Sequence, residues 1–185
     1  MNHEILNDAE TRMKKSVEAF RHELVKIRTG KASTALLDGI RVDYYGTQVP
    51  LNQVASLSTP EPRLIIIQPW DKGMIGKIEK EILKSDLGLN PVNDGTFIRL
   101  AVPMLTEERR KDLVKLVRKY AEESRVAIRN IRRDTNEHLK REEKDSNISE
   151  DDLKKLQTRT QELTDKYIKN IDEVLDKKEK EIMEV

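Results

Sequence analysis

Apolar residues recur every three or four positions along three long stretches of the chain, and charged residues fill most of the positions between them. This spacing places the apolar side chains on one narrow face of a helix. The longest stretch, residues 106–145, contains neither Gly nor Pro and predicts a single helix about 60 Å long. Its expected seam toward partner helices consists of mostly apolar or small residues: Leu113, Val117, Tyr120, Ser124, Ala127, Ile128, Ile131, Thr135 and His138.

Two further stretches carry matching seams, one over residues 2–28 and one beginning at Ser149. Ser149 is an expected N-cap, and Asp152 occupies the capping-box position three residues later. Three helices with narrow apolar faces, and a tight turn at Asn147, predict an antiparallel three-helix bundle. The seam residues expected in these two helices are Leu6, Ala9, Met13, Val17, Phe20, Leu24 and Ile27, then Leu153, Leu156, Thr160, Leu163, Tyr167, Ile171, Val174, Leu175 and Ile182.

Between the first two helices, residues 30–105 follow the period-two alternation of half-buried strands, as in Ile40, Val42 and Tyr44. Gly, Pro and Asn-Asp-Gly turns separate the apolar runs. One helix is expected at about residues 71–84, with an apolar face of Ile75, Ile78, Ile82 and Leu83. Besides the strand at 40–44, strands are expected ending near Pro50 and at 53–59, 63–68 and 96–102.

The predicted fold class is therefore α+β and mostly α. Residues 1–29 and 106–185 are expected to form the bundle, and residues 30–105 a small α+β domain inserted into it. Two adjacent chain segments, 29–33 and 103–106, would join the two parts and act as a hinge. Gly30 supplies backbone freedom there, and Pro103 prevents the long helix from extending backwards. The hinge residues singled out in these segments are Thr29, Gly30, Lys31, Pro103, Met104 and Leu105.

Charge is distributed unevenly, although the formal net charge is only +1. Residues 109–133 contain ten Lys or Arg against three acidic residues, whereas residues 146–185 contain eight against eleven. Charged residues make up 37% of the chain and aromatic residues 4%, a composition typical of long amphipathic helices. A polarised surface of this kind favours polyanionic partners.

Five cationic residues form a stripe along the long helix, roughly 120 to 130° around its axis from the seam. They are Lys111, Arg118, Arg125, Arg129 and Arg132. Composition alone favours a solvated face whose charges pair along the helix. Against this, Arg125, Arg129 and Arg132 have no acidic residue three or four positions away except Glu122, three before Arg125. Arginine also binds phosphate through two parallel hydrogen bonds. Because aromatic residues are not interleaved, the stripe suits a duplex or folded RNA and not single-stranded bases.

Catalysis, cofactor binding and metal binding are not expected. The three histidines, His3, His22 and His138, are not at ligand spacing, and cysteine is absent. Neighbouring carboxylates such as Glu122 and Glu123 diverge by about 100° on a helix and cannot share a proton or a metal. Neither a run of eighteen apolar residues nor a signal peptide occurs, so a soluble, cytoplasmic protein without a membrane partner is expected. The chain is also expected to be a monomer.

Six segments, in order and spread over nearly the whole chain, closely resemble the bacterial ribosome recycling factor family. They are KIRTGKAS (26–33), LLDGIRVDYYGT (36–47), SDLGLNPVNDGTFIRL (85–100), LTEERRKDLVKLV (105–117), VAIRNIRRD (126–134) and ISEDD (148–152). Members commonly have Pro where this chain has Thr34, which bears on the stiffness of the hinge.

The resemblance implies an L-shaped molecule, with the bundle as the long arm and a β/α/β domain as the short arm. It further implies binding to the 70S ribosome after termination, with the bundle on large-subunit rRNA. With elongation factor G and GTP, members split the subunits so that mRNA and deacylated tRNA are released; the GTPase is the partner. Arg28 and Gly30 are placed at the elbow. The expected rRNA-binding residues, from the resemblance and the stripe together, are Arg110, Arg118, Arg125, Arg129, Arg132 and Arg133.

Two other classes of function stay open from the residues alone. A coiled-coil adaptor would bind a protein partner through its charged helices, and its association would be insensitive to ribonuclease. An enzyme acting on tRNA would show turnover by the isolated protein.

Overall fold

The computed structural model describes the backbone of residues 2–184 and the side chains of residues 4–184. The chain divides into two compact units. One is Gly30–Thr106, and the other combines the residues before and after that segment.

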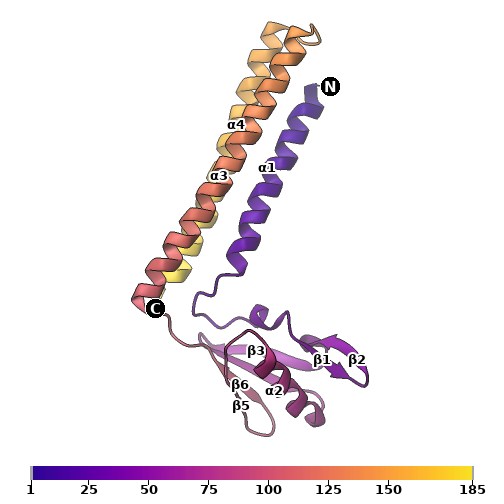
Figure 1. Cartoon of the computed structure of the whole chain (residues 1–185), viewed down its shortest axis with the longest axis vertical. Helices are drawn as coiled ribbons and strands as arrows, with labels where there is room; N and C mark the ends of the chain where they lie inside the picture. The colour runs from indigo at the N-terminus through magenta and orange to yellow at the C-terminus, as the bar shows by residue number, and fades with distance from the viewer. Residues whose placement is uncertain (1, 185) are drawn as a thin grey trace. The chain divides into compact units, whose positions relative to one another are not determined.

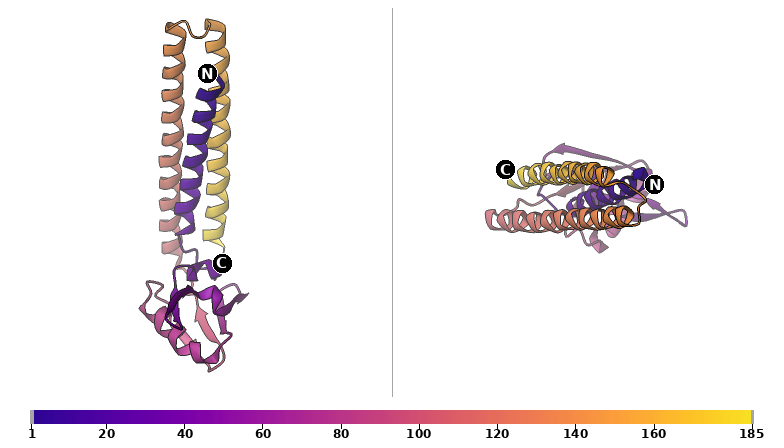
Figure 2. Two further views of the ribbon diagram at one scale, coloured as in Figure 1. Left: turned by 90° about the vertical axis from the view of Figure 1, so that its right-hand side faces the viewer. Right: turned by 90° about the horizontal axis from the view of Figure 1, so that it is seen from above.

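Three long helices form the first unit: α1 (Asn2–Val25), α3 (Glu107–Lys144) and α4 (Glu150–Met183). They lie side by side, with α3 antiparallel to the other two (Figures 1 and 2). At the α3–α4 turn the Asn147 N–H donates to the Glu142 carbonyl, and Ser149 caps α4 through a capping box with Asp152. Beside this turn, Leu6, Leu139, Ile148 and Leu156 close the end of the core. The predicted three-helix bundle is confirmed.

The seam of α1 is buried as expected, except that Ile27 lies beyond the helix and is only half-buried. In α3 the expectation for His138 was wrong, because its side chain is 55% exposed and Leu139 occupies the core position instead. Ala121 is fully buried although it was not assigned to the seam. Since α3 packs against two helices, its buried face is displaced from the three-four line that its most apolar residues suggested.

Threonines occupy three core positions of the bundle without leaving a hydroxyl unsatisfied. Thr135, Thr160 and Thr164 each donate to the carbonyl four residues earlier, over 2.7 to 2.8 Å. Such bonds satisfy the hydroxyl within its own helix, so the methyl group can pack in the seam.

The second unit contains a hairpin, a four-stranded antiparallel sheet and one helix (Figure 1). The hairpin consists of β1 (Arg41–Tyr44) and β2 (Thr47–Pro50). The sheet has the order β3 (Ala55–Glu61), β4 (Leu64–Pro69), β6 (Ile98–Ala101) and β5 (Pro91–Asn93). The helix α2 (Ile75–Lys84) contacts β1 and β5. Short 3-10 turns cover Thr34–Leu37, Leu51–Gln53 and Lys72–Met74.

The core of this unit follows from the alternation along its two central strands. Ile65 lies opposite Leu100 and Ile67 opposite Ile98, and all four are fully buried. Helix α2 covers them with Ile78 and Ile82, but Leu83 is 60% exposed, contrary to expectation. Tyr44 is also 40% exposed, because β1 belongs to a two-stranded hairpin that leaves its end uncovered.

Strand β5 was not expected, because Pro91 was interpreted as a separator between elements. It is the first residue of a strand at the edge of the sheet, paired with Leu100 of β6. Proline is tolerated at the start of an edge strand, where its missing N–H costs no ladder bond.

The ends of the second unit are both attached to the β3–β4 turn. The Ala32 N–H donates to the Pro62 carbonyl at 2.7 Å, and the Val102 N–H donates to the Arg63 carbonyl at 2.8 Å. Gly30 has φ +79°, and a Cβ there would lie 3.2 Å from the Leu105 Cγ. The two ends of the insertion are therefore held next to each other within the unit.

Candidate RNA-binding face of the bundle

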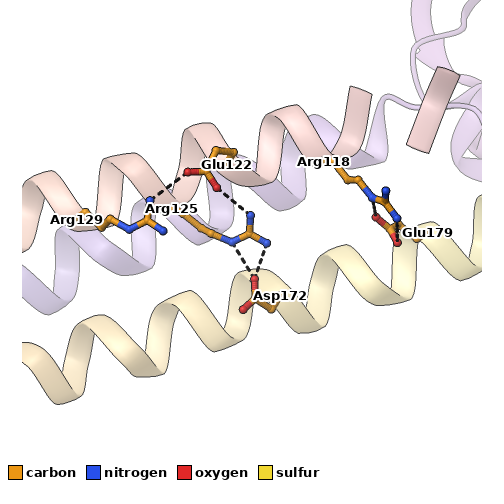
Figure 3. A network of polar contacts seen from close by, with 6 residues as sticks. All are labelled: Arg118, Glu122, Arg125, Arg129, Asp172 and Glu179. Carbon is orange, nitrogen blue, oxygen red and sulfur yellow. Dashed lines mark hydrogen bonds and ion pairs between the residues drawn. The ribbon is translucent and has the colours of Figure 1, made fainter. Parts of the chain in front are cut away.

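Two arginines of the predicted stripe reach across to α4 (Figure 3). The Arg118 guanidinium donates to both oxygens of Glu179, from Nε at 2.5 Å and from Nη2 at 3.2 Å. Seven residues further along α3, Arg125 donates to Asp172 Oδ1 from Nη2 at 2.6 Å and from Nε at 2.9 Å. These pairs join residues 61 and 47 positions apart in the sequence, so they bridge the two helices.

Glu122 of α3 connects two arginines of its own helix. Its Oε2 accepts from Arg125 and its Oε1 from Arg129, each at 3.1 Å. Figure 3 shows the carboxylate between the two guanidinium groups. Three arginines of the stripe are thus matched by three carboxylates, and their charges are largely compensated.

The pKa values of these groups shift in the direction that keeps them charged. The hydrogen bond and charge of Glu179 raise the pKa of Arg118. The bonds from Arg129 and then Arg125 lower the pKa of Glu122. For Arg125 burial alone would lower the pKa, but its bonds to Asp172 and Glu122 outweigh burial and raise it. The network therefore persists as ion pairs at neutral pH.

The remaining three predicted rRNA-binding residues differ in their surroundings. Arg132 is half-buried, and its Nη1 donates to the neutral Gln161 Oε1 at 3.2 Å. Arg133 is exposed and, within the described part of the chain, makes no hydrogen bond or ion pair. Arg110 is half-buried near the end of α4, where its Nη1 donates to the Met183 carbonyl at 3.2 Å while its Nε is buried without a partner in the described residues. None of the six belongs to the apolar core.

Arg129 and Arg132 have no acidic residue three or four positions away, but Arg125 and Arg129 do bind carboxylates. The partners come from α4, or from seven residues away in the case of Arg129 and Glu122. The part of the surface whose positive charge is not compensated lies beside the stripe, on the outer side of α3. Four of its members are exposed residues that make no ion pair or hydrogen bond with the described residues: Lys115, Lys119, Arg133 and Lys140.

These four residues fall within an arc of about 60° at 100° per residue. We call them, together with Arg132, which lies about 80° further around the helix than Lys140, the cationic face. Its two arginines were among the residues predicted from the sequence, but its three lysines were not. The seven-residue step from Arg133 to Lys140 was a usable signal, because such a step nearly restores the same direction on a helix.

The predicted hinge residues lie after the end of α1 and before the start of α3. Helix α1 stops at Val25, three residues before the expected end, and α3 begins at Glu107. Arg28 and Lys31 are exposed, Thr29 is half-buried, and Pro103 and Met104 are exposed. Leu105 is half-buried, next to Gly30.

The described residues contain no cluster of three His, Cys, Asp or Glu side chains that could hold a metal ion. None of the described helices is both long and apolar enough to span a membrane.

The fold and the cationic face define a two-unit binding protein, built from a three-helix bundle and an inserted antiparallel α+β unit. The sequence profile described as ribosome recycling factor matches residues 20–183. The chain belongs to the ribosome recycling factor family.

Individual relatives agree with this assignment along the whole chain. The ribosome-recycling factor of Halalkalibacterium halodurans is 58% identical over 185 residues, which cover all of both chains. That of Nitratidesulfovibrio vulgaris is 59% identical over 181 residues, covering 98% of this chain and 97% of the relative.

Two solved structures are similar to the whole chain. A solution structure of the ribosome recycling factor has a TM-score of 0.79 and 46% identity, and the match covers 100% of this chain and 98% of the other. A second describes models of the T. thermophilus ribosome recycling factor and the E. coli elongation factor G bound to the E. coli post-termination complex. The match to it has a TM-score of 0.65, with 47% identity and complete coverage of both chains.

Proposed function

We propose that this chain binds the post-termination 70S ribosome and, with elongation factor G and GTP, promotes its dissociation into subunits. Release of mRNA and deacylated tRNA would accompany this step. Membership of the ribosome recycling factor family supports the role, as does the similar chain described together with elongation factor G on a post-termination complex. GTP hydrolysis is assigned to the partner, so this chain performs no chemical step of its own.

The cationic face is the observation that carries the mechanism. The bundle would act as a rigid body that docks on large-subunit rRNA through phosphate contacts from this face. Lysine and arginine contacts to phosphates position a protein without reading sequence. Each phosphate neutralised releases counterions, so affinity should fall as salt rises.

We assign unequal roles to the six arginines. Arg132 and Arg133 can offer uncompensated charge directly to phosphates. Three others already bind carboxylates: Arg118, Arg125 and Arg129. They would contact RNA only by giving up or sharing that carboxylate, which reduces their net contribution to the binding free energy. Arg110 of α3 lies next to the end of α4 and would contribute a phosphate contact at the edge of the docked surface.

The second unit is proposed to move as one body about residues 26–31 and 103–106. Both of its ends are bonded to the β3–β4 turn, so motion within the unit is opposed there. The segments just outside these bonds have no regular secondary structure and separate the unit from α1 and α3. A pivot at that point would let elongation factor G push the unit while the bundle stays docked.

A double variant, Arg132→Ala with Arg133→Ala, tests the docking. Each exposed ion pair contributes up to about 1 kcal/mol, so loss of two phosphate contacts should weaken binding to isolated large subunits about tenfold at low salt. The slope of log affinity against log salt should fall by about two. Co-sedimentation of the full chain over a salt series measures both quantities.

Arg21→Ala is the matched control, because Arg21 is an exposed arginine of α1 whose side chain is 52% accessible. It should leave the affinity and the salt slope unchanged, and circular dichroism should show all variants folded. Equal affinities for the double variant and the unmodified chain would reject the docking face. Ribonuclease-insensitive association with a protein partner would instead favour the adaptor.

A further inference from the structure

Two ion pairs between α3 and α4 are spaced by seven residues. Arg118 bonds Glu179 and Arg125 bonds Asp172, so a step of seven along α3 is matched by a step of seven backwards along α4. A seven-residue step returns to nearly the same direction on a helix, displaced by about 20°. The next pair in this antiparallel register is Arg132 with Asp165.

The third pair does not form. Instead, Arg132 Nη1 donates to Gln161 Oε1 at 3.2 Å, and Gln161 Nε2 donates to Asp165 Oδ1 at 2.8 Å. Gln161 and Asp165 are four residues apart and therefore neighbours on one face of α4. The amide oxygen of Gln161 accepts the hydrogen bond of Arg132, and its amide N–H donates to Asp165, the carboxylate that the register would pair with Arg132.

We propose that Gln161 is a positioning residue that separates Arg132 from Asp165, and so keeps the full charge of Arg132 available to a ribosomal phosphate. The inference rests on the proposed docking of the cationic face. Two arginines of the stripe, Arg118 and Arg125, then link the helices through ion pairs. Arg132 is instead oriented by a neutral partner.

The physical basis is the difference between an amide and a carboxylate as an acceptor. An amide oxygen fixes the direction of the guanidinium but leaves its net charge intact. A carboxylate compensates the charge, and a phosphate must then compete with it. Among these three arginines, Arg132 alone bonds a neutral side chain, while Arg125 bonds two carboxylates.

Two substitutions at Gln161 test this in the full chain. Gln161→Glu keeps the shape and places a carboxylate on Arg132, so large-subunit binding at low salt should weaken about two- to fivefold, as an exposed ion pair allows. The salt slope should fall by up to about one. Gln161→Met removes both hydrogen bonds and lets Arg132 pair with Asp165, which should also weaken binding.

Rescue separates this role from a general effect on the fold. Adding Asp165→Asn should restore the affinity of Gln161→Met but not that of Gln161→Glu, because only the first loses binding through Asp165. Asn170→Asp adds the same charge about 180° around α4 and should change neither affinity nor slope. Melting temperatures of the variants at Gln161 and Asp165 should stay within about 3 °C, because both residues are exposed.

Arg132→Ala distinguishes failure of this inference from failure of the proposed function. If Arg132→Ala binds large subunits as tightly as the unmodified chain, the docking role of Arg132 is rejected and this inference with it. If Arg132→Ala weakens binding while Gln161→Glu does not, only the role of Gln161 is overturned. A Gln161→Met variant that Asp165→Asn does not rescue would overturn it as well.

Discussion

Tyr167 of α4 and Glu10 of α1 form the contact whose removal should have the most informative effect on stability. The tyrosine is 4% exposed, and its hydroxyl donates to Glu10 Oε1 at 2.7 Å. Lys166 and Lys14 lie 3.5 and 3.9 Å from the same carboxylate oxygen. Tyr167→Phe would remove the hydroxyl and keep the ring in the core.

The expected cost is about 1 to 2 kcal/mol of unfolding free energy, toward the lower end of the range for a hydrogen bond to a charged group. The lower end applies because 29% of the Glu10 side chain is accessible, so water can replace part of the lost bond. The two lysines also continue to stabilise the carboxylate. Urea denaturation followed by far-UV circular dichroism measures this, since most of the helix is in the bundle.

The loss of stability caused by Tyr167→Phe should become smaller in acid. The hydrogen bond from Tyr167, opposed by desolvation and aided by the two lysines, lowers the pKa of Glu10 below its ordinary value of 4.5. A group whose folded-state pKa is lowered stabilises the fold fully above its unfolded pKa and loses that contribution as pH falls through its folded pKa. The stability gap between the unmodified chain and Tyr167→Phe should therefore narrow as pH drops below about 4.5.

The alkaline side gives an independent check on the same contact. Burial and the neighbouring Glu10 raise the pKa of Tyr167 from 10.0 to about 12. A raised pKa stabilises the fold below the unfolded value, and this contribution is lost as pH rises from about 10 through about 12. Tyr167→Phe cannot titrate and should lack this loss.

Tyr120→Phe is the matched control, because Tyr120 is a half-buried bundle tyrosine that takes part in no hydrogen bond among the described residues. It should change stability by less than about 0.5 kcal/mol. The Tyr167–Glu10 hydrogen bond does not stabilise the fold in this way if Tyr167→Phe costs no more than this control, or if its cost is the same at pH 7 as in acid.

Two further predictions concern the stripe and the hinge. Glu122→Gln removes the carboxylate shared by Arg125 and Arg129. Binding to large subunits at low salt should therefore strengthen about two- to fivefold. Unchanged co-sedimentation with large subunits would mean that these arginines do not face RNA. Gly30→Ala should destabilise the Gly30–Thr106 unit by about 1 to 2 kcal/mol, because φ +79° is strained for an L-residue and the added Cβ would lie 3.2 Å from Leu105 Cγ. Hydrogen exchange of the β4 and β6 amides measures this, and Gly39→Ala, which meets no atom within 4 Å, should have a smaller effect.

Local patterns in the chain were sufficient to predict most of the helices. Helix α3 begins and ends within one residue of the expected bounds, and the capping box of Ser149 and Asp152 forms as expected. Both features depend on residues three or four positions apart, whose geometry is set by the helix itself. Misassignments such as His138 occurred where a side chain lies at the margin of the seam, since the neighbouring helices decide where burial ends.

Strands were predicted less completely, for the same reason. Alternation identified the buried face of β4 and β6, but the exposure of Tyr44 and Leu83 depends on which elements cover them. The edge strand β5 was missed because its first residue, Pro91, was interpreted only by its local effect. Pairing with β6 is a tertiary property and leaves little trace in three residues of sequence.

The amino-acid order alone specified a bundle seam, a separate α+β insertion and a row of cations along α3, because periodicity and caps act over a few residues. Tertiary structure alone decided which of those cations are compensated. Glu179 and Asp172 meet Arg118 and Arg125 only through the antiparallel register of α3 and α4, across 61 and 47 residues of chain. That register results from packing two whole apolar faces together, so no short segment contains the information.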